Sequence, residues 1–545
     1  MSAVANAASR LVAIFLASGT AAGTTVVFLH AQRDRVAQLT EMLQVHQPVQ
    51  ELHLISHGSS GKVWFGNGEL SLGTLAQHAA LLQQWPAFLA NDAELVLYGC
   101  HVALDPQVPG QTHPLIERLQ ALTGAQVAAT VTPTGAAQRG GNWEMEAGTS
   151  HREAGLALMG STQQAYAGVL ASSDEPFTVT NTNSSGDGSL RSAILQANSN
   201  EGANTIIFDS SLSGDTISLT SGQLEITGPV TIKGLGAEEI AVDASDNTRV
   251  FYIDDGSFET SIEVKIRKLA ISGGNSERGG GGILNNESLT LSNVKVYGNT
   301  TDSDGGGIVN GGTLNLINST ISGNSADLSG GGIDNQISTL NVTNSTISGN
   351  YAYYGGGGID NTAQYGGGAE RNAKVSLSNS TIAGNSAYYG GGGITNNLGT
   401  VSLSNSIIAN NENADISKAD DLDTINIKGI NLVEDGSLTG KNVINQDPNL
   451  SPLQDNGGST KTHALRSGSP AINAGDNSEI PPDTQDLNGD GDTGENIPYD
   501  QRGQDFGRLV NGNVDLGSYE FNASTSADIS RGTLKKNLQR LYLSR

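Results

Sequence analysis

The chain is poorest in cysteine, and this scarcity removes whole classes of site. Cys100 is the only cysteine among 545 residues, so neither an internal disulfide nor a metal site with several cysteine ligands can form. The chain also lacks a run of about 18 apolar residues, the length that a transmembrane helix requires, so we expect no membrane span. Neither absence excludes secretion from a bacterial cell.

Basic residues are also scarce. The 29 Lys and Arg stand against 55 Asp and Glu, which gives a formal net charge of −26, and the acidic excess lies in residues 171–521. Phosphate binding needs a basic face, so nucleic acid is not an expected partner. An acidic surface is compatible with Ca²⁺ or with an extracellular environment.

Glycine, by contrast, is abundant and marks an internal repeat. Many of the 71 glycines form short runs between about Arg278 and Asn411, and each run precedes an isoleucine anchor. The anchors recur after 25, 25, 26 and 35 residues, at Ile283, Ile308, Ile333, Ile359 and Ile394. The segments between them alternate apolar and polar residues with the strand period and have no helical spacing. A repeat of this length, built from short strands, predicts a right-handed parallel β-helix over residues 177–445.

Asparagines recur in step with the anchors. Coils of such a helix stack roughly 4.8 Å apart, so like residues lie on like residues, and stacked amides can hydrogen-bond along the axis. The two asparagine series are Asn285, Asn310, Asn335, Asn361 and Asn396, and Asn299, Asn324, Asn350, Asn385 and Asn411. We therefore expect a scaffold of about nine or ten coils, with the long spacing marking one inserted loop, Ala363 to Ala373.

Residues 9–147 alternate strand-like and helix-like segments, which predicts a separate α/β domain with a parallel sheet. The expected strands are 11–17, 24–30, 51–57, 93–99 and 125–131, and the expected helices are 33–43, 72–89 and 113–122. Two of these strands end in His57-Gly58 and Cys100. The carboxyl ends of parallel strands meet at one edge of a sheet, and a reactive thiol needs a nearby imidazole.

This pattern resembles known families. A hydrophobic run ending in His-Gly (LHLISHG), followed about forty residues later by one ending in cysteine (LVLYGC), resembles the caspase-like cysteine peptidases. The surrounding sequence, as far as GGNWEME, is similar to an uncharacterised domain found at the N-terminus of many large bacterial surface proteins. The resemblance implies that Cys100 is a nucleophile and His57 its general base, with backbone N–H groups of Gly58 and Cys100 as oxyanion donors.

The chain also departs from the peptidase pattern. Gly99 stands where caspases usually have alanine, and His-Val-Ala follows the cysteine. An alternative therefore stays open, in which the His-Gly and Gly-Cys pairs are tight turns that end strands and Cys100 is a small buried residue.

The remaining segments frame the β-helix. Residues 148–176 are small and polar and are interpreted as a linker. Residues 177–209 resemble the N-terminal cap of secreted bacterial β-helix proteins, and residues 446–521 resemble the closing segment of the "choice-of-anchor" group, whose repeats are like those of polymorphic outer-membrane proteins. This resemblance implies an extracellular or cell-surface location, associated with the outer membrane. The export route and the role of the basic tail, 522–545, stay open.

Two surface features of the repeat are candidate ligand sites. Tyr353-Tyr354 and Tyr388-Tyr389 precede successive glycine runs, so their rings should stack as an exposed platform for sugars or a partner protein. The alternative is that they only cover a glycine-rich corner. Asp334 and Asp360 each follow an anchor in successive coils, so we expect an outward carboxylate pair, which is a candidate for binding Ca²⁺ or a ligand or for hydrolysing glycosides. No basic residue is in step with the pair, which counts against catalysis.

An acidic loop, DLNGDGDTGEN, is a candidate Ca²⁺ site. Asp486, Asn488, Asp490 and Asp492 fit the first half of an EF-hand loop. Ile497 stands where the bidentate glutamate belongs, so a weaker Ca²⁺ site is expected, the alternative being an acidic flexible loop.

These observations favour one function over two others. The main hypothesis is an adhesin-like bacterial β-helix protein that binds extracellular carbohydrate or another surface component, with a caspase-like accessory domain. The first alternative is a cysteine peptidase that uses Cys100 and His57 on its own chain or on a partner. The second is a β-helix enzyme that degrades polysaccharide.

Overall fold

The computed structural model describes residues 12–17, 24–29, 34–56, 58–64, 69–105, 112–132, 134, 142–148, 176–200, 203–257, 260–363, 373–419, 421–488, 490–510 and 512–522. Over these residues, no helix has both the length and the apolar character needed to cross a membrane. The chain forms two compact units, Met1–Phe177 with Leu195–Thr205, and Thr178–Ile194 with Ile206–Arg545. The predicted linker lies almost wholly outside the described residues, as does the predicted tail.

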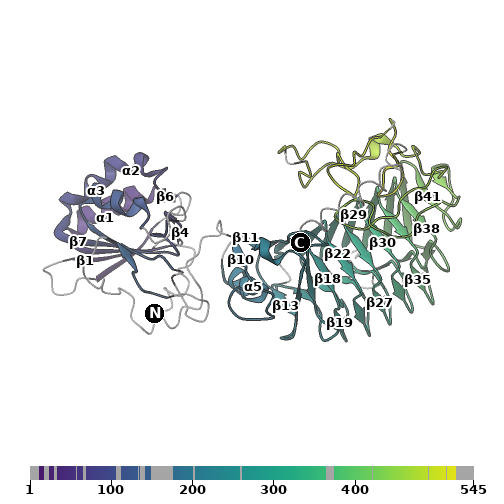
Figure 1. Ribbon diagram of the computed structural model, residues 1–545, viewed down its shortest axis with the longest axis horizontal. Helices are drawn as coiled ribbons and strands as arrows, with labels where there is room; N and C mark the ends of the chain where they lie inside the picture. Colours follow the sequence, from purple (N-terminus) through teal and green to yellow (C-terminus); the bar gives the residue numbers. More distant parts are fainter. Residues whose placement is uncertain are drawn as a thin grey trace, which may run out of the picture. The chain divides into compact units, whose positions relative to one another are not determined.

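The N-terminal unit is built on a six-stranded sheet (Figure 1). The strands, in sheet order, are β2 (Thr24–Phe28), β1 (Val12–Ala17), β3 (Val49–Ile55), β7 (Leu89–Tyr98), β8 (Gln126–Ala129) and β9 (Ala147–Gly148). A small second sheet consists of β4 (Gly58–Ser59), β5 (Lys62–Trp64) and β6 (Glu69–Ser71). The helices are α1 (Arg35–His46), α2 (Leu75–Leu82), the 3-10 helix η2 (Trp85–Ala87) and α3 (Pro114–Thr123). Each predicted strand overlaps a strand of the structure and each predicted helix overlaps a helix, although the segment 72–89 contains α2, η2 and the start of β7 rather than one helix.

The prediction of a parallel sheet holds only at its centre. β3, β7 and β8 are parallel, but β1 runs antiparallel to both of its neighbours, β2 and β3. Residues 18–23 are too few for the crossover of a dozen or more residues that a parallel pair needs. β1 and β2 therefore pair as an antiparallel ribbon.

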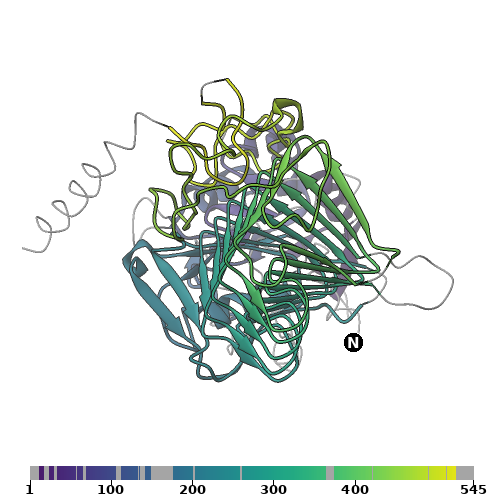
Figure 2. The same cartoon turned by 90° about the vertical axis from the view of Figure 1, so that its right-hand side faces the viewer.

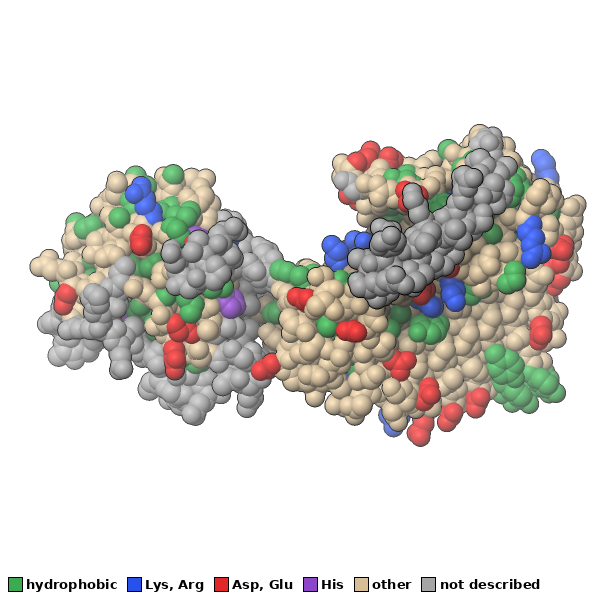
Figure 3. Space-filling view, viewed as in Figure 1, with side chains coloured by type: hydrophobic (Ala, Val, Ile, Leu, Met, Phe, Trp, Pro, Cys, Tyr) green, Lys and Arg blue, Asp and Glu red, His purple; other side chains and the backbone are tan. Residues whose placement is uncertain are grey.

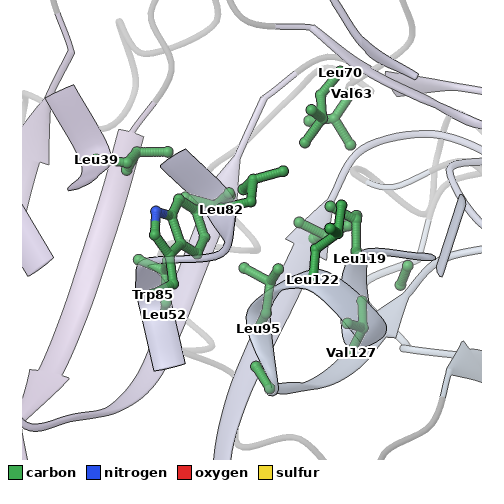
Figure 4. Close-up of a cluster of buried hydrophobic side chains, with 14 of the residues drawn as sticks. Leu39, Leu52, Val63, Leu70, Leu82, Trp85, Leu95, Leu119, Leu122 and Val127 are labelled. Atoms are coloured by element: carbon green, nitrogen blue, oxygen red, sulfur yellow. The ribbon is translucent and has the colours of Figure 1, made fainter. Parts of the chain in front are cut away.

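The helices lie on one face of this sheet (Figure 1). Leu52, Leu95 and Val127 point to that face and pack into a core with Trp85 of η2 (Figure 4). Trp85 is 2% exposed, and its indole N–H donates to Thr40 Oγ1 at 2.8 Å, so its polar atom is satisfied inside the core. This packing fixes the positions of β3 and β7, which carry the candidate catalytic residues at their ends.

The C-terminal unit is a solenoid of stacked strands (Figures 1 and 2). Its first sheet contains β10 (Phe177–Val179), β11 (Asn204–Phe208), β14 (Val230–Lys233), β17 (Glu263–Arg267), β21 (Ser288–Ser292), β25 (Thr313–Ile317), β29 (Thr339–Thr343), β33 (Lys374–Ser378), β37 (Thr400–Ser404) and β40 (Thr424–Lys428). Its second contains β12 (Asp215–Ser218), β15 (Ile240–Asp243), β18 (Ala270–Ser272), β22 (Lys295–Tyr297), β26 (Thr320–Ser322), β30 (Thr346–Ser348), β34 (Thr381–Ala383), β38 (Ile407–Ala409), β41 (Asn431–Val433) and β42 (Val443–Ile444).

Two shorter sheets complete the coils. The third contains β13 (Leu224–Ile226), β16 (Phe251–Ile253), β20 (Ile283–Asn285), β24 (Ile308–Asn310), β28 (Ile333–Gln336), β32 (Ile359–Thr362), β36 (Ile394–Asn397) and β39 (Ile416–Lys418). The fourth contains β19 (Asn275–Ser276), β23 (Thr300–Thr301), β27 (Ser325–Ala326), β31 (Tyr351–Ala352) and β35 (Ser386–Ala387). The helix α5 (Leu190–Ser199) and the 3-10 helix η4 (Ser210–Leu212) precede the first full coil. The predicted parallel solenoid and its number of coils are confirmed.

The register of the coils follows the repeat. Ile308 pairs with Ile333, and Ile333 with Ile359, in parallel strands, and each of these anchors is fully buried. The asparagines form continuous hydrogen-bonded ladders: Asn324 Nδ2 donates to Asn350 Oδ1 at 2.9 Å, and Asn350 Nδ2 donates to Asn385 Oδ1 at 2.9 Å. The ladders satisfy amides that are cut off from water. The loop predicted between Ala363 and Ala373 has its ends in register, and residues 364–372 lie outside the described residues.

Residues 446–521, which we call the C-terminal strap, lie along the side of the solenoid (Figure 2). They contain the 3-10 helix η5 (Asn477–Glu479). Hydrogen bonds join the strap to coils that lie far apart in the stack. Asn405, in the coil of β37, donates to the carbonyl of Asp476 in the strap at 2.9 Å. Arg267 of β17 donates to Gln485 in the strap at 2.9 Å. The strap therefore ties together many coils rather than closing only the last one.

A buried ionic cluster holds the strap together. Arg502 binds Asp500 at 2.6 Å and lies between the rings of Phe506 and Tyr519, 3.9 and 3.8 Å from their centroids. Arg508 donates to Asn344 Oδ1 of the solenoid at 3.1 Å and to the Gly517 carbonyl at 2.5 Å. Both arginines are almost fully buried, so their charges require buried counterions.

The cluster contains one more acid than base. Asp500, Asp515 and Glu520 are all at most 1% exposed and face the two arginines. Burial, together with the nearby Asp515 and Asp500, raises the pKa of Glu520 to about 8, against the opposing effect of Arg508. Protonation of Glu520 at neutral pH therefore lowers the negative charge that is buried beside the two arginines.

Candidate functional sites

Cys100 follows β7 and lies in the interior of the N-terminal unit. Its side chain is 1% exposed. Its Sγ accepts a hydrogen bond from the Thr134 backbone N–H at 3.2 Å and lies 3.8 Å from the Thr134 carbonyl oxygen. A nucleophilic thiol must reach its substrate, and this one is enclosed by protein. The environment of Cys100 is that of a small buried residue.

The strand ends that carry the predicted dyad do meet. β3 and β7 pair in parallel up to Ile55 and Tyr98, as expected. A Cβ atom added to Gly58 would lie 2.6 Å from Val102 Cγ2 and 2.8 Å from the carbonyl carbon of Gly99, so glycine is required here by close packing. His57 lies outside the described residues, and the dyad itself stays a prediction.

The other face of the sheet carries a polar network that sequence reasoning missed. His53 is fully buried, and its Nδ1 lies 3.1 Å from Tyr98 Oη and its Nε2 3.1 Å from Glu51 Oε2. Burial lowers the pKa of His53, although the hydrogen bond and charge of Glu51 oppose this shift. The alternation of residues in β3 is the signal that places Glu51 and His53 on the face opposite Leu52.

Four tyrosines form the predicted platform. Tyr353 stacks on Tyr388 with ring centroids 5.0 Å apart and planes 7° from parallel, and Tyr354 stacks on Tyr389 at 5.8 Å and 15°. Within each pair the rings meet edge to face at 4.8 Å. The two pairs occupy equivalent positions because the Tyr388 and Tyr389 N–H groups donate to the carbonyls of Ala352 and Tyr353 in the coil before.

The tyrosine rings are exposed. Their exposed fractions are 38% for Tyr353, 50% for Tyr354, 61% for Tyr388 and 54% for Tyr389. A hydrophobic patch is visible on the edge of the solenoid that carries β27 and β35 (Figure 3). We call these four residues the tyrosine patch. Exposed aromatic side chains that gather in one patch are a candidate binding surface.

Asp334 and Asp360 are not accessible to solvent, so the expectation of an outward, accessible carboxylate pair is wrong. They do stack in register, but they are only 2% and 4% exposed. Gln336 donates to Asp334, and Thr362 Oγ1 donates to Asp360 at 2.6 Å. Burial raises the pKa of both carboxyl groups, and for Asp334 the charge of Asp360 adds to the effect.

The acidic loop of the strap has local order but no carboxylate cage. The Gly491 N–H donates to Asp486 Oδ1 at 3.1 Å, as the first and sixth positions of an EF-hand loop would. The Asp492 N–H donates to Asp490 Oδ1 at 2.8 Å, and the Asn488 amide donates to Asp490 and Glu495 at 3.0 and 2.5 Å. Of the described acids in this loop, no three bring their oxygens within 4.8 Å of one another.

A group of three acids does converge elsewhere. The carboxylates of Asp254, Asp255 and Glu287 lie within 4.8 Å of one another, which is the one such group among the described residues. Glu287 accepts from the backbone N–H groups of Asp255 at 3.0 Å and Ile262 at 2.9 Å. The group thus ties the loop after β16 to the turn after β20. Sequence reasoning missed it because Asp254 and Asp255 belong to a coil that precedes the regular repeat, so the spacing did not align them with Glu287 in the next coil.

Comparison with known proteins matches a family to the N-terminal part of the chain. Residues 12–170 match the family described as "Domain of unknown function (DUF4347)". Neither a caspase-like family nor the choice-of-anchor group was identified. No curated protein and no solved structure matches the chain. The chain therefore contains a region similar to the DUF4347 domain, followed by a parallel β-solenoid.

Proposed function

We propose that the solenoid is a right-handed β-helix that serves as an adhesin-like binding module at the bacterial cell surface or outside the cell. Its ligand is extracellular carbohydrate, and the tyrosine patch is the contact surface. The observation that carries this proposal is the pair of stacked, exposed tyrosine columns of Tyr353 with Tyr388 and Tyr354 with Tyr389. The domain of residues 9–147 is its caspase-like accessory domain.

The chemistry of the patch suits sugar rings. Tyrosine rings give large, rigid contact area with a polar hydroxyl at the tip, and the C–H faces of sugars pack on such rings. Asp327 and Asp302 occupy the positions equivalent to Tyr353 in the two preceding coils. The same backbone hydrogen bond shows this equivalence: the Tyr353 N–H donates to the Ala326 carbonyl, and the Asp327 N–H donates to the Thr301 carbonyl. Both acids are exposed and offer acceptors for sugar hydroxyls beside the rings.

The test is glycan binding by the full chain and by a Tyr353→Ala/Tyr388→Ala variant. Loss of one stacked column should weaken binding by about tenfold or more, equal to about 1.4 kcal/mol. Tyr297→Ala removes a half-buried tyrosine of the second sheet and should leave binding unchanged. A glycan array on which the folded wild-type chain binds nothing, or equal binding by both variants, would contradict the proposal.

The two enzymatic alternatives have less support. As a peptidase, Cys100 would have to leave its contacts with Thr134 and become accessible. As a polysaccharide hydrolase, the solenoid would depend on Asp334 and Asp360, whose carboxyl groups are too buried to touch a polymer chain.

Calcium binding by the acidic loop forms part of the proposal. Asp486, Asn488, Asp490 and Asp492 supply oxygen ligands at alternate positions, and extracellular modules of this kind bind Ca²⁺ with Kd of roughly 10⁻⁴–10⁻³ M. Calorimetric titration of the full chain should give binding in this range, and Asp490→Asn should weaken it about tenfold by removing one charged ligand. Asp447→Asn, at an exposed site elsewhere in the strap, is the control. Equal Ca²⁺ affinities for Asp490→Asn and the wild type would contradict the assignment of this loop as a Ca²⁺ site.

A further inference from the structure

A cleft separates the strap from the first sheet of the solenoid. Its volume is about 300 Å³, at the lower end of the range of roughly 300–1,000 Å³ for ligand pockets. The outer faces of β25, β29 and β33 form its floor, and residues 481–485 with Leu487 and Ile497 form its wall. It lies on a different face of the solenoid from the tyrosine patch, which follows strands of the fourth sheet.

The floor presents polar groups that make no hydrogen bond to the described residues. Asn341 stacks between Asn315 and Ser376, and Thr343 is followed in register by Ser378. The Asn341 amide donates to Asn315 Oδ1 at 2.9 Å, which leaves Asn341 Oδ1 with no donor among the described residues. The hydroxyls of Thr343, Ser376 and Ser378 likewise make no hydrogen bond to the described part of the chain. Adjacent coils thus offer a row of donors and acceptors to a ligand.

The wall is apolar and held in place. Leu487 packs on a small core of Ile480, Ile497 and Val514. Backbone hydrogen bonds join the two sides of the wall, from Ile497 N–H to the Pro481 carbonyl at 2.9 Å and from Asp483 N–H to the Glu495 carbonyl at 2.6 Å. The Arg267–Gln485 hydrogen bond ties the same segment to the solenoid. The cleft is therefore bounded by anchored backbone on both sides.

The lining selects for an uncharged ligand. No Lys or Arg side chain belongs to the described lining, so an anionic ligand would find no counterion. Its one acid, Asp483, is 1% exposed and accepts from the Leu487 N–H at 2.7 Å, so it offers no free charge to a cation. The floor strands are paired on both sides, which leaves no backbone edge for an extended peptide to join.

We propose that this cleft binds a neutral saccharide. Hydroxyl groups of one sugar edge bind the row formed by Asn341, Thr343, Ser376 and Ser378, and the C–H face of the ring packs against Pro482 and Leu487 of the wall. A sugar combines these polar and apolar surfaces, and the volume suits a mono- or disaccharide unit. This site is distinct from the tyrosine patch, and its existence does not depend on the function proposed for that patch.

The decisive experiment removes hydroxyls from the floor while keeping its shape. The full-length Thr343→Val/Ser376→Ala variant is compared with the wild type on an array of neutral oligosaccharides, with calorimetry on the sugars that bind. Loss of two hydrogen-bonding groups should weaken binding by roughly tenfold or more. Thr400→Val/Ser402→Ala is the matched control. These two residues pair with Lys374 and Ser376 in the next coil and lie outside the cleft lining.

The outcomes separate the two sites. Binding of a neutral sugar that survives Tyr353→Ala/Tyr388→Ala and the control but is lost in the floor variant supports the inference. Binding lost only in the tyrosine variant supports the tyrosine patch and overturns the cleft. The inference is also overturned if the wild type binds no neutral sugar, or if a peptide library, rather than the sugars, shows the dependence on Thr343 and Ser376.

Discussion

Asn350→Ala should lower the free energy of unfolding of the solenoid by about 3–5 kcal/mol. Asn350 is 1% exposed, and its Oδ1 accepts from both the backbone N–H of Asn324 at 3.0 Å and its side-chain amide at 2.9 Å. Its own amide donates to the Ile321 carbonyl at 3.1 Å and to Asn385 Oδ1 at 2.9 Å. Alanine would leave these groups unpaired away from water, at about 1–3 kcal/mol for each group that finds no new partner.

Chemical denaturation combined with hydrogen exchange of the full chain would measure this loss, because a solenoid can unfold in parts. The control is Asn426→Ala, since Asn426 is exposed on β40 and is not part of a buried ladder. We expect the control to change stability by less than about 0.5 kcal/mol. If both variants lose the same amount, the ladders do not stabilise the stack. Reduced protection should extend from Asn350 to the coils on either side.

The regular part of this fold could be predicted because its contacts repeat. Each coil touches mainly its neighbours, so the interval between Ile308 and Ile333 is also the register of β24 on β28. The same interval places Asn310 on Asn335, and the longer interval from Ile359 to Ile394 places Tyr353 on Tyr388. The tyrosine patch was therefore predictable from spacing alone.

Burial was less predictable than register. Alternation along β28 places Ile333 inside, so Asp334 should face solvent, yet it is buried. The glycine run explains this result, because a Cβ added to Gly330 would lie 2.6 Å from Asp334 Cβ. Glycine lets the chain fold closely over the outer side of β28, and no strand period reports such a covering segment.

Segments that do not repeat gave the least information. Nothing in residues 446–521 indicates that Arg508 contacts Asn344 or that Gln485 contacts Arg267, since these contacts span well over a hundred residues. The cleft exists only because of such contacts, so no sequence pattern could predict it. In the N-terminal unit, Cys100 is likewise buried against a residue, Thr134, that no sequence pattern links to it.

Arg508→Met should destabilise the strap by about 3–5 kcal/mol at neutral pH, because it leaves buried acids without a counterion. Arg508 is 1% exposed, and its charge opposes the rise that burial causes in the pKa of Glu520 and of Asp515. Without it, both pKa values should rise further. Thermal unfolding and hydrogen exchange in residues 446–521 would measure the effect. Arg466→Met, at an exposed position of the strap, is the control and should change little.

The pH dependence distinguishes lost charge balance from lost packing. In the wild type, the pKa of Glu520 is raised to about 8, above the usual value of 4.5, so its contribution to stability is present at low pH and is lost as the pH rises toward 8. In Arg508→Met, the folded protein should bind more protons on these acids than the wild type does. Its stability should therefore fall more steeply as the pH rises. The variant should therefore lie closer to the wild type at pH 5 than at pH 8. A deficit that is equal at both pH values would mean that Arg508 acts through packing and hydrogen bonds alone, and that the acids of the strap do not depend on its charge.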